Sequence, residues 1–573
     1  MKFRREAWGF GAFLIVAIFA GTLIAAGDAP QGGAVTNARL LAADSSSSDW
    51  ILYGRDYGSH RYSTLTQIDR SNVKSLQVAW QRSLGANDSL EATPMVNGDT
   101  LYVTTGRDAV FAFDAKTGAL RWHYAYPFVT QSISVSCCNE DNRGVTLYDN
   151  EVITSTQDAH LIALDATTGK LLWNTTVANY KDGYTMTSPP LVVKHMLIAG
   201  VGGGEFGIRG FVAAYDAETG KPVWRHYTIP GPGQPGYSTW EAPGSWNRPG
   251  GPTWVQGTYD PSLNLIYWGV GNPTPLYDPH ANKGSLLFTD SLLALDADTG
   301  KLRWHYQYTP HDIWDYDGVN EPTIVDLPIN GTTVKAVAEA NRNGMLYLLD
   351  RTNGKPIWVE SYVDKTTFAT VDRATGKLTY NPQILSYANA LTPYLLCPAH
   401  IGGKNWNPAA YDPTSHVYFI PSAEGCDVVA PKKQTFIRGR SDYGGGTKYY
   451  PKNPIHGSIV AVDLTTGKTV WKKHLQDAQF SGVLVTAGGL VFTGDPNGQL
   501  RAFDESTGDI LWSYQTSSGL NASPITYAID GQQYIAMLSG TGGTWPGRIE
   551  AMPWLKNVKN GASLYVFSLG GTH

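Results

Sequence analysis

VFAFDAKTGALRW, at residues 110–122, is the stretch that decides the fold, because its pattern returns along the whole chain. In each copy an alternating apolar run ends in Asp, a short polar turn contains Gly, and a second run ends in Trp. Two period-2 runs joined by such a turn predict a β-hairpin. The other copies are at residues 161–173, 212–224, 292–304, 346–358, 459–471 and 500–512.

The two ends of the chain carry incomplete copies of this pattern. Trp80 closes a variant at 66–80 that lacks the Thr-Gly turn, and residues 562–571 form an apolar strand with no turn or Trp after it. We therefore expect one blade to be shared between the chain ends. The fold class predicted is all-β, an eight-bladed β-propeller of four-stranded antiparallel blades with Trp-containing repeats, over residues 49–573. The repeated Asp and Trp are expected to fix turns and pack between blades, so they carry little information about chemistry.

The N-terminal residues 1–27 have a basic start followed by an uncharged apolar run from Trp8 to Gly27. This pattern indicates export, through either a cleaved signal peptide or an uncleaved membrane anchor, since about 20 apolar residues can span a bilayer. Residues 28–48 are expected to be a flexible linker. The body would then be periplasmic, where disulfides form. A net charge of -5 gives no indication of nucleic-acid binding.

Function is expected where the sequence breaks its own period, because insertions in a repeat fold often carry it. The first break is SVSCCNEDNRG, residues 134–144, where Cys137 and Cys138 are adjacent. Their Cα atoms would be about 3.8 Å apart, less than in most disulfides, so a bond between them would be strained. Strained geometry persists where the surrounding structure enforces it, often at functional sites.

Two further breaks place single polar residues in unusual settings. Glu205 lies among glycines in GVGGGEFGIRG, where a strand and not a helix follows, so the likeness to a dinucleotide-binding glycine motif is accidental. Backbone crowding around a ligand or ion explains this Glu better. Residues 251–275 contain Trp254, off the repeat period, and Asn272 in a Gly-Asn-Pro turn. The alternative for this stretch is a loop with an exposed Trp.

The fourth break is TPHDIWDYDGVNE, residues 309–321, in which Asp315 and Asp317 alternate with Trp314 and Tyr316. A solvated acidic loop is the plain alternative, but the interleaved aromatic residues indicate burial, and buried carboxylates need a cation or a donor. In a strand-like segment the two Asp side chains would point to the same side.

An all-oxygen metal site follows from combining these breaks. Two carboxylates together with Glu205 and the Asn272 amide suit a hard cation such as Ca²⁺. The histidines show no metal-binding spacing, so zinc is not indicated at this site.

These breaks, in this order on a Trp repeat, resemble the pyrroloquinoline quinone (PQQ)-dependent alcohol dehydrogenases of the methanol and ethanol dehydrogenase type. The opening DWILYGRDYGSHRYSTLTQI (49–68) and KNWNP (404–408) are similar to that family too, and the resemblance runs from about Asp49 to the C-terminus. It implies that PQQ is the cofactor and that a primary alcohol, such as methanol or ethanol, is oxidised to the aldehyde.

The resemblance also assigns roles to residues. It implies that a Cys137–Cys138 disulfide packs on one face of PQQ and Trp254 on the other. Metal ligands would be Glu205, Asn272, Asp315 and Asp317, with Asp315 also acting as the general base. Hydrogen bonds to PQQ would come from Glu91, Arg143, Thr187 and Asn405, and Arg342 would lie against the quinone oxygens.

Asp317 bears on the identity of the metal. In calcium-dependent relatives the position two after the catalytic Asp usually has a small or uncharged residue, whereas lanthanide-dependent relatives have Asp there. A trivalent ion has more charge to neutralise, so the resemblance favours a lanthanide ion, with Ca²⁺ as the alternative.

Departures from the family pattern also have consequences. No C-x-x-C-H motif occurs, so electrons are expected to pass to a separate carrier, a soluble cytochrome c. Phe480 stands where relatives often carry Trp, so the cavity wall is expected to differ there. Cys397 and Cys426, in an exported chain, are expected to form a structural disulfide.

Other readings remain open on the sequence alone. They are a calcium-dependent version of the same enzyme, a sugar dehydrogenase of a related quinoprotein group, and a non-catalytic propeller scaffold of outer-membrane assembly. A scaffold has no need of the Cys pair, Glu205 or the segment around Asp315. The sequence fixes neither the alcohol nor the oligomeric state; homodimers are common among relatives, and some relatives carry a small extra subunit.

Overall fold

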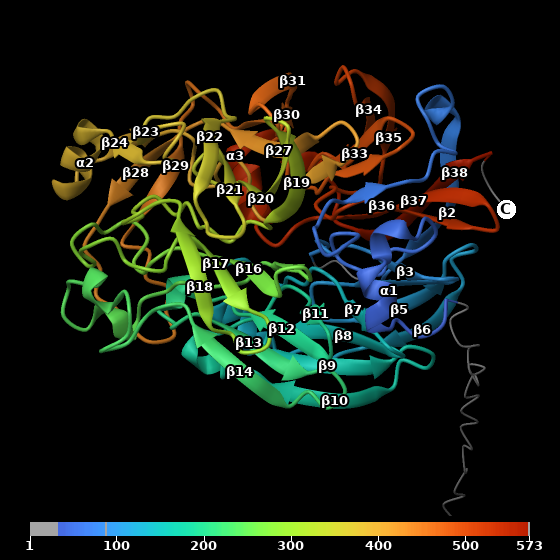
Figure 1. Ribbon diagram of the computed structural model, residues 1–573, viewed down its shortest axis with the longest axis horizontal. Coiled ribbons are helices and arrows are strands. Elements are labelled where there is room, and N and C mark those ends of the chain that lie inside the picture. The colour runs from blue at the N-terminus through green and yellow to red at the C-terminus, as the bar shows by residue number, and fades with distance from the viewer. Residues whose placement is uncertain (1–31, 86–88, 571–573) are drawn as a thin grey trace, which may run out of the picture.

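The structure is a computed structural model that describes residues 32–85 and 89–570 (Figure 1). Its regular structure is mainly β-strand, in antiparallel sheets that follow one another around a ring in chain order. The last strands (red) come back to lie beside the first (blue). This architecture is a β-propeller with four-stranded antiparallel sheets.

The first sheets take consecutive strands. They are β3 (Met95–Asn97), β4 (Thr100–Thr104), β5 (Val110–Asp114) and β6 (Leu120–Tyr124); β7 (Thr146–Tyr148), β8 (Glu151–Thr156), β9 (His160–Asp165) and β10 (Leu171–Thr176); β11 (Leu191–Val193), β12 (Met196–Gly200), β13 (Phe211–Asp216) and β14 (Pro222–Tyr227); and β15 (Thr258–Asp260), β16 (Leu265–Val270), β17 (Ser291–Asp296) and β18 (Leu302–Gln307).

The sheets of the second half follow the same scheme with additions. They are β19 (Thr323–Ile329), β20 (Thr332–Ala340), β21 (Met345–Asp350) and β22 (Pro356–Ser361); β26 (Ala410–Asp412), β27 (Val417–Glu424), β30 (His456–Asp463) and β31 (Lys468–Leu475); and β32 (Leu484–Thr486), β33 (Leu490–Gly494), β34 (Gln499–Asp504) and β35 (Ile510–Gln515), to which β1 (Tyr62–Ser63) adds in parallel.

The sheet that closes the ring joins the chain ends, as predicted. β2 (Leu76–Ser83) pairs antiparallel with β38 (Ala562–Leu569), which continues into β37 (Gln532–Gly540) and β36 (Ile525–Ile529). Trp80 on β2 donates its indole N–H to Ala115 O, 3.3 Å away beside β5, and Trp512 on β35 donates its indole N–H to Leu76 O at 3.2 Å. Both neighbouring sheets are thus hydrogen-bonded to this one.

The repeat works as a contact between successive sheets. In the copy at 161–173, Asp165 Oδ1 accepts from the backbone N–H and the hydroxyl of Thr168, at 2.8 and 2.7 Å, and so fixes the turn. Gly169 follows with φ 70°, and a Cβ there would lie 2.5 Å from the ring of Trp122 on the preceding sheet. Trp122 donates its indole N–H to Ala166 O at 2.9 Å. The structural role expected for the repeated Asp and Trp is confirmed here.

The long connections form small additions outside the ring. They hold β23 (Ala369–Val371), β24 (Leu378–Tyr380), β25 (Tyr394–Leu396), β28 (Asp427–Pro431), β29 (Gly445–Tyr449) and α2 (Pro382–Asn389). They form two insertions, residues 362–409 between β22 and β26 and residues 425–455 between β27 and β30. The expected disulfide between Cys397 and Cys426 ties the two insertions together. α3 (Trp545–Ala551) lies between β37 and β38.

Short 3₁₀ segments complete the structure: η1 (Ala43–Ser45), η2 (Val73–Ser75), η3 (Thr130–Val135), η4 (Tyr180–Asp182), η5 (Gly204–Phe206), η6 (Tyr237–Thr239), η7 (Ser245–Asn247) and η8 (Pro553–Asn557). Among the described residues, no helix has the length and apolar character needed to cross a membrane. The export signal or anchor predicted for residues 1–27 lies outside the described residues.

The expectation of a flexible linker does not hold for residues 32–48. They contain α1 (Asn37–Leu41), and Leu40 and Ala43 are buried against the propeller. Arg39 pairs with Asp49 at 3.0 Å, and Arg55 donates to the carbonyl of Ala43. The composition of the segment did not predict the burial of Leu40 and Ala43 or the hydrogen bonds of the two arginines, which together hold the segment in place.

Candidate cofactor and metal site

A cavity of about 510 Å³ contains nearly all the predicted site residues. Its walls include Glu91, Cys137, Cys138, Arg143, Thr187, Glu205, Trp254, Asp315, Asp317, Arg342 and Asn405. Asn272 is buried beside this wall and bonds one of its members. The structure thus brings together residues spread over more than half of the sequence.

These residues share a position in the fold. Several stand in the loop just before the first strand of a sheet: Glu91 before β3, Arg143 before β7, Trp254 before β15, Asp317 before β19 and Asn405 before β26. First strands such as β3, β7 and β15 are buried along their length, whereas fourth strands such as β10 and β14 are largely exposed. The cavity therefore lies where the innermost strands begin.

The segment around Asp315 is a loop and not the strand-like segment expected. Asp315 and Asp317 have φ of 63° and 46°, in the left-handed region. Asp312 stabilises this path, because its carboxylate oxygens accept from the backbone N–H groups of Trp314 and Tyr316 at 3.0 and 2.9 Å. Both aromatic side chains are fully buried, as their interleaving predicted. Despite the different backbone, both Asp side chains reach the cavity.

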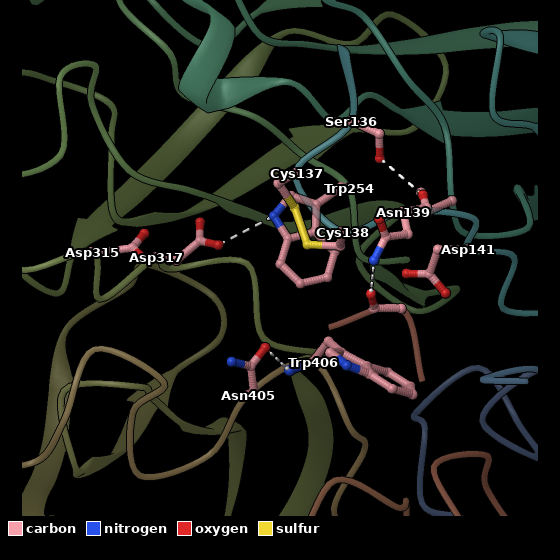
Figure 2. Close-up of a disulfide and its surroundings, with 12 residues drawn as sticks. Ser136, Cys137, Cys138, Asn139, Asp141, Trp254, Asp315, Asp317, Asn405 and Trp406 are labelled. Carbon is pink, nitrogen blue, oxygen red and sulfur yellow. Dashed lines mark hydrogen bonds between the residues drawn. A yellow bond between two sulfur atoms is a disulfide. The ribbon is translucent and has the colours of Figure 1, made fainter. Parts of the chain in front are cut away.

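Asp317 accepts three hydrogen bonds from other members of the site. Its Oδ1 accepts from the backbone N–H of Asn272 at 3.1 Å, and its Oδ2 accepts from Trp254 Nε1 at 3.2 Å and from Arg342 Nη1 at 3.0 Å. Figure 2 shows the bond between Asp317 and the indole. Asp315 Oδ2 lies 3.7 Å from Arg342 Nη2, so one guanidinium faces both carboxylates.

Asn272 presents an oxygen without a partner. Its amide nitrogen donates to Pro273 O at 3.0 Å, which leaves Oδ1 buried and unpartnered. A buried, unsatisfied amide oxygen beside carboxylates is a group that a cation would satisfy.

Three carboxyl groups of this site, on Glu205, Asp315 and Asp317, have one guanidinium close by, that of Arg342. Burial, with a contribution from Asp317, raises the pKa of Glu205 to about 7. Burial also raises the pKa of Asp315 well above its usual range; the Asp317 and Glu205 charges add to this, and Arg342 opposes it. Such raised pKa values are expected where a buried anionic cluster calls for a cation.

The adjacent cysteines form a disulfide, as predicted. The disulfide and Trp254 both line the cavity, and in the view of Figure 2 the sulfur atoms lie in front of the indole. Asn139 follows with φ 61° and donates to Gly543 O at 2.7 Å, which fixes the loop to the C-terminal part of the chain.

A second charged network occupies another part of the wall. Arg143 donates to Glu91 Oε2 at 2.8 Å and to Thr187 Oγ1 at 2.6 Å. Its guanidinium also lies over the rings of Trp254 and Trp406, with centroids at 5.0 and 4.5 Å. Cation–π contact of this kind holds the guanidinium in place.

Sequence reasoning missed several members of this wall. Asp141 bonds Arg143, and Arg548 lies 3.3 Å from Glu91 Oε1 and 4.1 Å from the ring centroid of Phe480. Asp141 could have been found, since it lies within the quoted Cys stretch. Arg548 had no comparable signal, because none of the four breaks singled out in the sequence includes α3. Phe480 lines the cavity, and its ring lies against the Arg548 guanidinium.

The donor set fits a hard cation and an anionic planar ligand. Three carboxylates and an unpartnered amide oxygen supply oxygen ligands, whereas Arg143, Arg342 and Arg548 supply positive charge. An aromatic plane and a disulfide in the same cavity supply surfaces on which a flat ring system can pack.

Known proteins share this sequence and fold. Residues 50–375 and 472–535 match the family described as "PQQ: Glucose/ethanol/alcohol dehydrogenase, beta-propeller domain". The chain is 37% identical to a quinoprotein alcohol dehydrogenase of Pseudomonas putida, over 94% of this chain and 93% of that protein. It is 35% identical to a lanthanide-dependent methanol dehydrogenase of Methylacidiphilum fumariolicum, over 90% of this chain and 88% of that protein. Among solved structures, a europium-containing methanol dehydrogenase superposes with a TM-score of 0.88 at 33% identity, over 93% of this chain and 100% of that one.

Proposed function

The chain belongs to the PQQ-dependent alcohol dehydrogenase family, and on that basis we propose that it oxidises a small primary alcohol, such as methanol or ethanol, to the aldehyde. The observation that carries the proposal is the meeting of Glu205, Asp315, Asp317 and the unpartnered Asn272 Oδ1 at the cavity that holds the disulfide and Trp254. A cation and a flat anionic cofactor are the ligands that this combination suits.

Asp315 is the proposed base. Its Oδ2 faces Arg342, so Oδ1 is the oxygen that would accept the hydroxyl proton of the alcohol. When bound, the cation and PQQ supply a polarised carbonyl that accepts hydride from the alcohol carbon. Arg342 would stabilise the negative charge that appears there.

The remaining wall residues position the cofactor in this proposal. Glu91, Arg143, Thr187 and Asn405 would hydrogen-bond its polar edge. The Cys137–Cys138 disulfide and Trp254 would hold its two faces, and their rigidity lowers the entropy lost on binding. Arg143 is already fixed by Glu91 and Thr187, which favours a preorganised site.

We propose a lanthanide ion as the metal, coordinated by Glu205, Asn272, Asp315 and Asp317. The bond from the Asn272 backbone to Asp317 Oδ1 supports this choice, because it holds the additional carboxylate close to the unpartnered Asn272 oxygen. A trivalent ion gains more from that carboxylate than Ca²⁺ does.

Further parts of the proposal concern the whole chain. Residues 49–573 would form the quinoprotein propeller with the sheets as eight blades, exported to the periplasm by residues 1–27. Electrons would pass to a separate soluble cytochrome c. A homodimer is the proposed assembly.

The test compares wild type with Asp315→Asn after reconstitution with PQQ and La³⁺ or Ca²⁺. Wild type is expected to bind PQQ, seen by near-ultraviolet absorbance after dialysis, and to reduce an artificial dye with methanol or ethanol. Asp315→Asn is expected to keep bound PQQ and lose about a hundredfold or more in kcat. A wild-type protein that binds no PQQ and oxidises neither alcohol would contradict the proposal and favour a scaffold.

A further inference from the structure

A second group of metal-binding side chains lies away from the cavity. Asp364, Glu424, His456 and His474 each bring one ligand atom to within 4.8 Å of the other three. None of these residues lines the cavity, and none belongs to the site proposed above. Two imidazoles with two carboxylates are a ligand set that zinc and its neighbours among the transition metals prefer.

The sheet β26–β27–β30–β31 explains why three of these side chains meet. Glu424 at the end of β27 pairs with His456 at the start of β30, and Ser458 pairs with His474 on β31. His456 and Ser458 are two residues apart, so Glu424, His456 and His474 project from the same face of the sheet. Asp364 comes from the loop after β22, on the neighbouring sheet.

The hydrogen bonds around these side chains prepare them for a metal. His456 Nδ1 lies 3.0 Å from Pro454 O. Because a carbonyl oxygen can only accept a hydrogen bond, Nδ1 carries the proton, and the lone pair of Nε2 is available to bind a metal. Ser458 donates to Glu424 Oε1 at 2.6 Å and orients that buried carboxylate. The side chains of Asp364 and His474 are 51% and 57% exposed, and Asp364 Oδ2 already lies 3.8 Å from His474 Nδ1.

Lys472 now occupies the place between the carboxylates. Its ammonium lies 2.6 Å from Asp364 Oδ1 and 2.7 Å from Glu424 Oε1. A metal ion would have to displace this charge, and the lysine stem is long enough to swing into solvent. The Lys472 ammonium therefore competes with a metal ion for the two carboxylates and lowers the affinity of the site for that ion.

We propose that Asp364, Glu424, His456 and His474 form a binding site for a divalent transition metal of the Zn²⁺ type. The site lies where both insertions leave the propeller, since one starts after β22 near Asp364 and the other runs from Glu424 to His456. These insertions carry His400, Tyr443 and Tyr449 into the wall of the cavity. Metal binding would fasten the insertions at their roots.

The test uses the full chain with PQQ and saturating La³⁺ or Ca²⁺, so that the cavity site is filled, and Co²⁺ and Zn²⁺ as probes. Wild type is expected to bind one equivalent of Co²⁺, with visible absorbance bands that Zn²⁺ abolishes. The double variant His456→Ala/His474→Ala should lose these bands, whereas His195→Ala, at an exposed histidine elsewhere, should keep them.

Lys472→Met gives the sharpest result, because it removes the competitor and leaves all four ligands. Its affinity for Zn²⁺ is expected to rise about tenfold over wild type, by calorimetry. Retained far-ultraviolet circular dichroism would show that the double variant is folded. The proposal is overturned if neither wild type nor Lys472→Met binds Co²⁺ or Zn²⁺, or if binding survives in the folded double variant.

Discussion

At the level of single residues, the two disulfides differ in their place in the fold and in the length of the loop that each one closes. Cys137 and Cys138 are adjacent and line the cavity, whereas Cys397 and Cys426 are 29 residues apart and tie the insertions together. In the chain-entropy account, a disulfide stabilises a protein by restricting the unfolded chain, and the effect grows with the length of the loop that it closes. A bond between neighbours closes almost no loop, so its use must lie in the folded state.

We therefore expect opposite effects from removing each bond. Cys137→Ser/Cys138→Ser should weaken PQQ binding about tenfold, because a rigid packing surface is lost, and should leave the free energy of unfolding nearly unchanged. Cys397→Ser/Cys426→Ser should lower the free energy of unfolding by about 3 kcal/mol. Equilibrium dialysis of PQQ and denaturant unfolding of both variants measure the two effects. Equal losses of stability in both variants would contradict this separation.

At the scale of elements, the contact between a turn Gly and the Trp of the preceding sheet holds successive sheets together. Gly169→Ala would force φ 70° on a residue with a Cβ and push that Cβ into the Trp122 ring. Gly331, in the turn between β19 and β20, has φ 78° and open space around a Cβ. Gly331→Ala is therefore a matched control that measures only the cost of a positive φ at a residue with a Cβ.

Gly169→Ala is expected to lower the free energy of unfolding by about 3 kcal/mol, and Gly331→Ala by about 1 kcal/mol. The difference between these two losses measures the cost of the clash between the added Cβ and the Trp122 ring. Denaturant unfolding followed by tryptophan fluorescence measures both. If the two variants lost the same amount, the Trp–Gly contact would have no special role in holding sheets together.

At the scale of the whole molecule, the repeat made the fold predictable. Copies such as 161–173 specify hairpins by local pattern alone, and the unpaired strand at 562–569 led to the shared closing sheet. Single residues that break the repeat led to the cavity wall. The cavity residues could be predicted at these places because a single side chain, such as Glu205 among glycines, differs in kind from its neighbours in the sequence.

Other parts depend on contacts that no local pattern reveals. Arg548 contacts Glu91, which is 457 residues away in the sequence, and no residue pattern in α3 predicts this contact. Asp315 and Asp317 were expected on a strand-like segment, but Asp312 and two buried aromatic residues impose a left-handed path. Residues 32–48 were expected to be a linker, yet Leu40 and Arg39 attach them to the propeller.

We propose that Asp317 joins Glu205, Asn272 and Asp315 around a trivalent ion. The most direct measurement is dye-linked methanol and ethanol oxidation by the PQQ-reconstituted protein in La³⁺ or Ca²⁺, for wild type and Asp317→Ala. We expect activity with La³⁺ that exceeds activity with Ca²⁺ and is lost in Asp317→Ala, because the variant removes a carboxylate from the metal. Activity with Ca²⁺ that equals or exceeds activity with La³⁺ and survives in Asp317→Ala would contradict the claim.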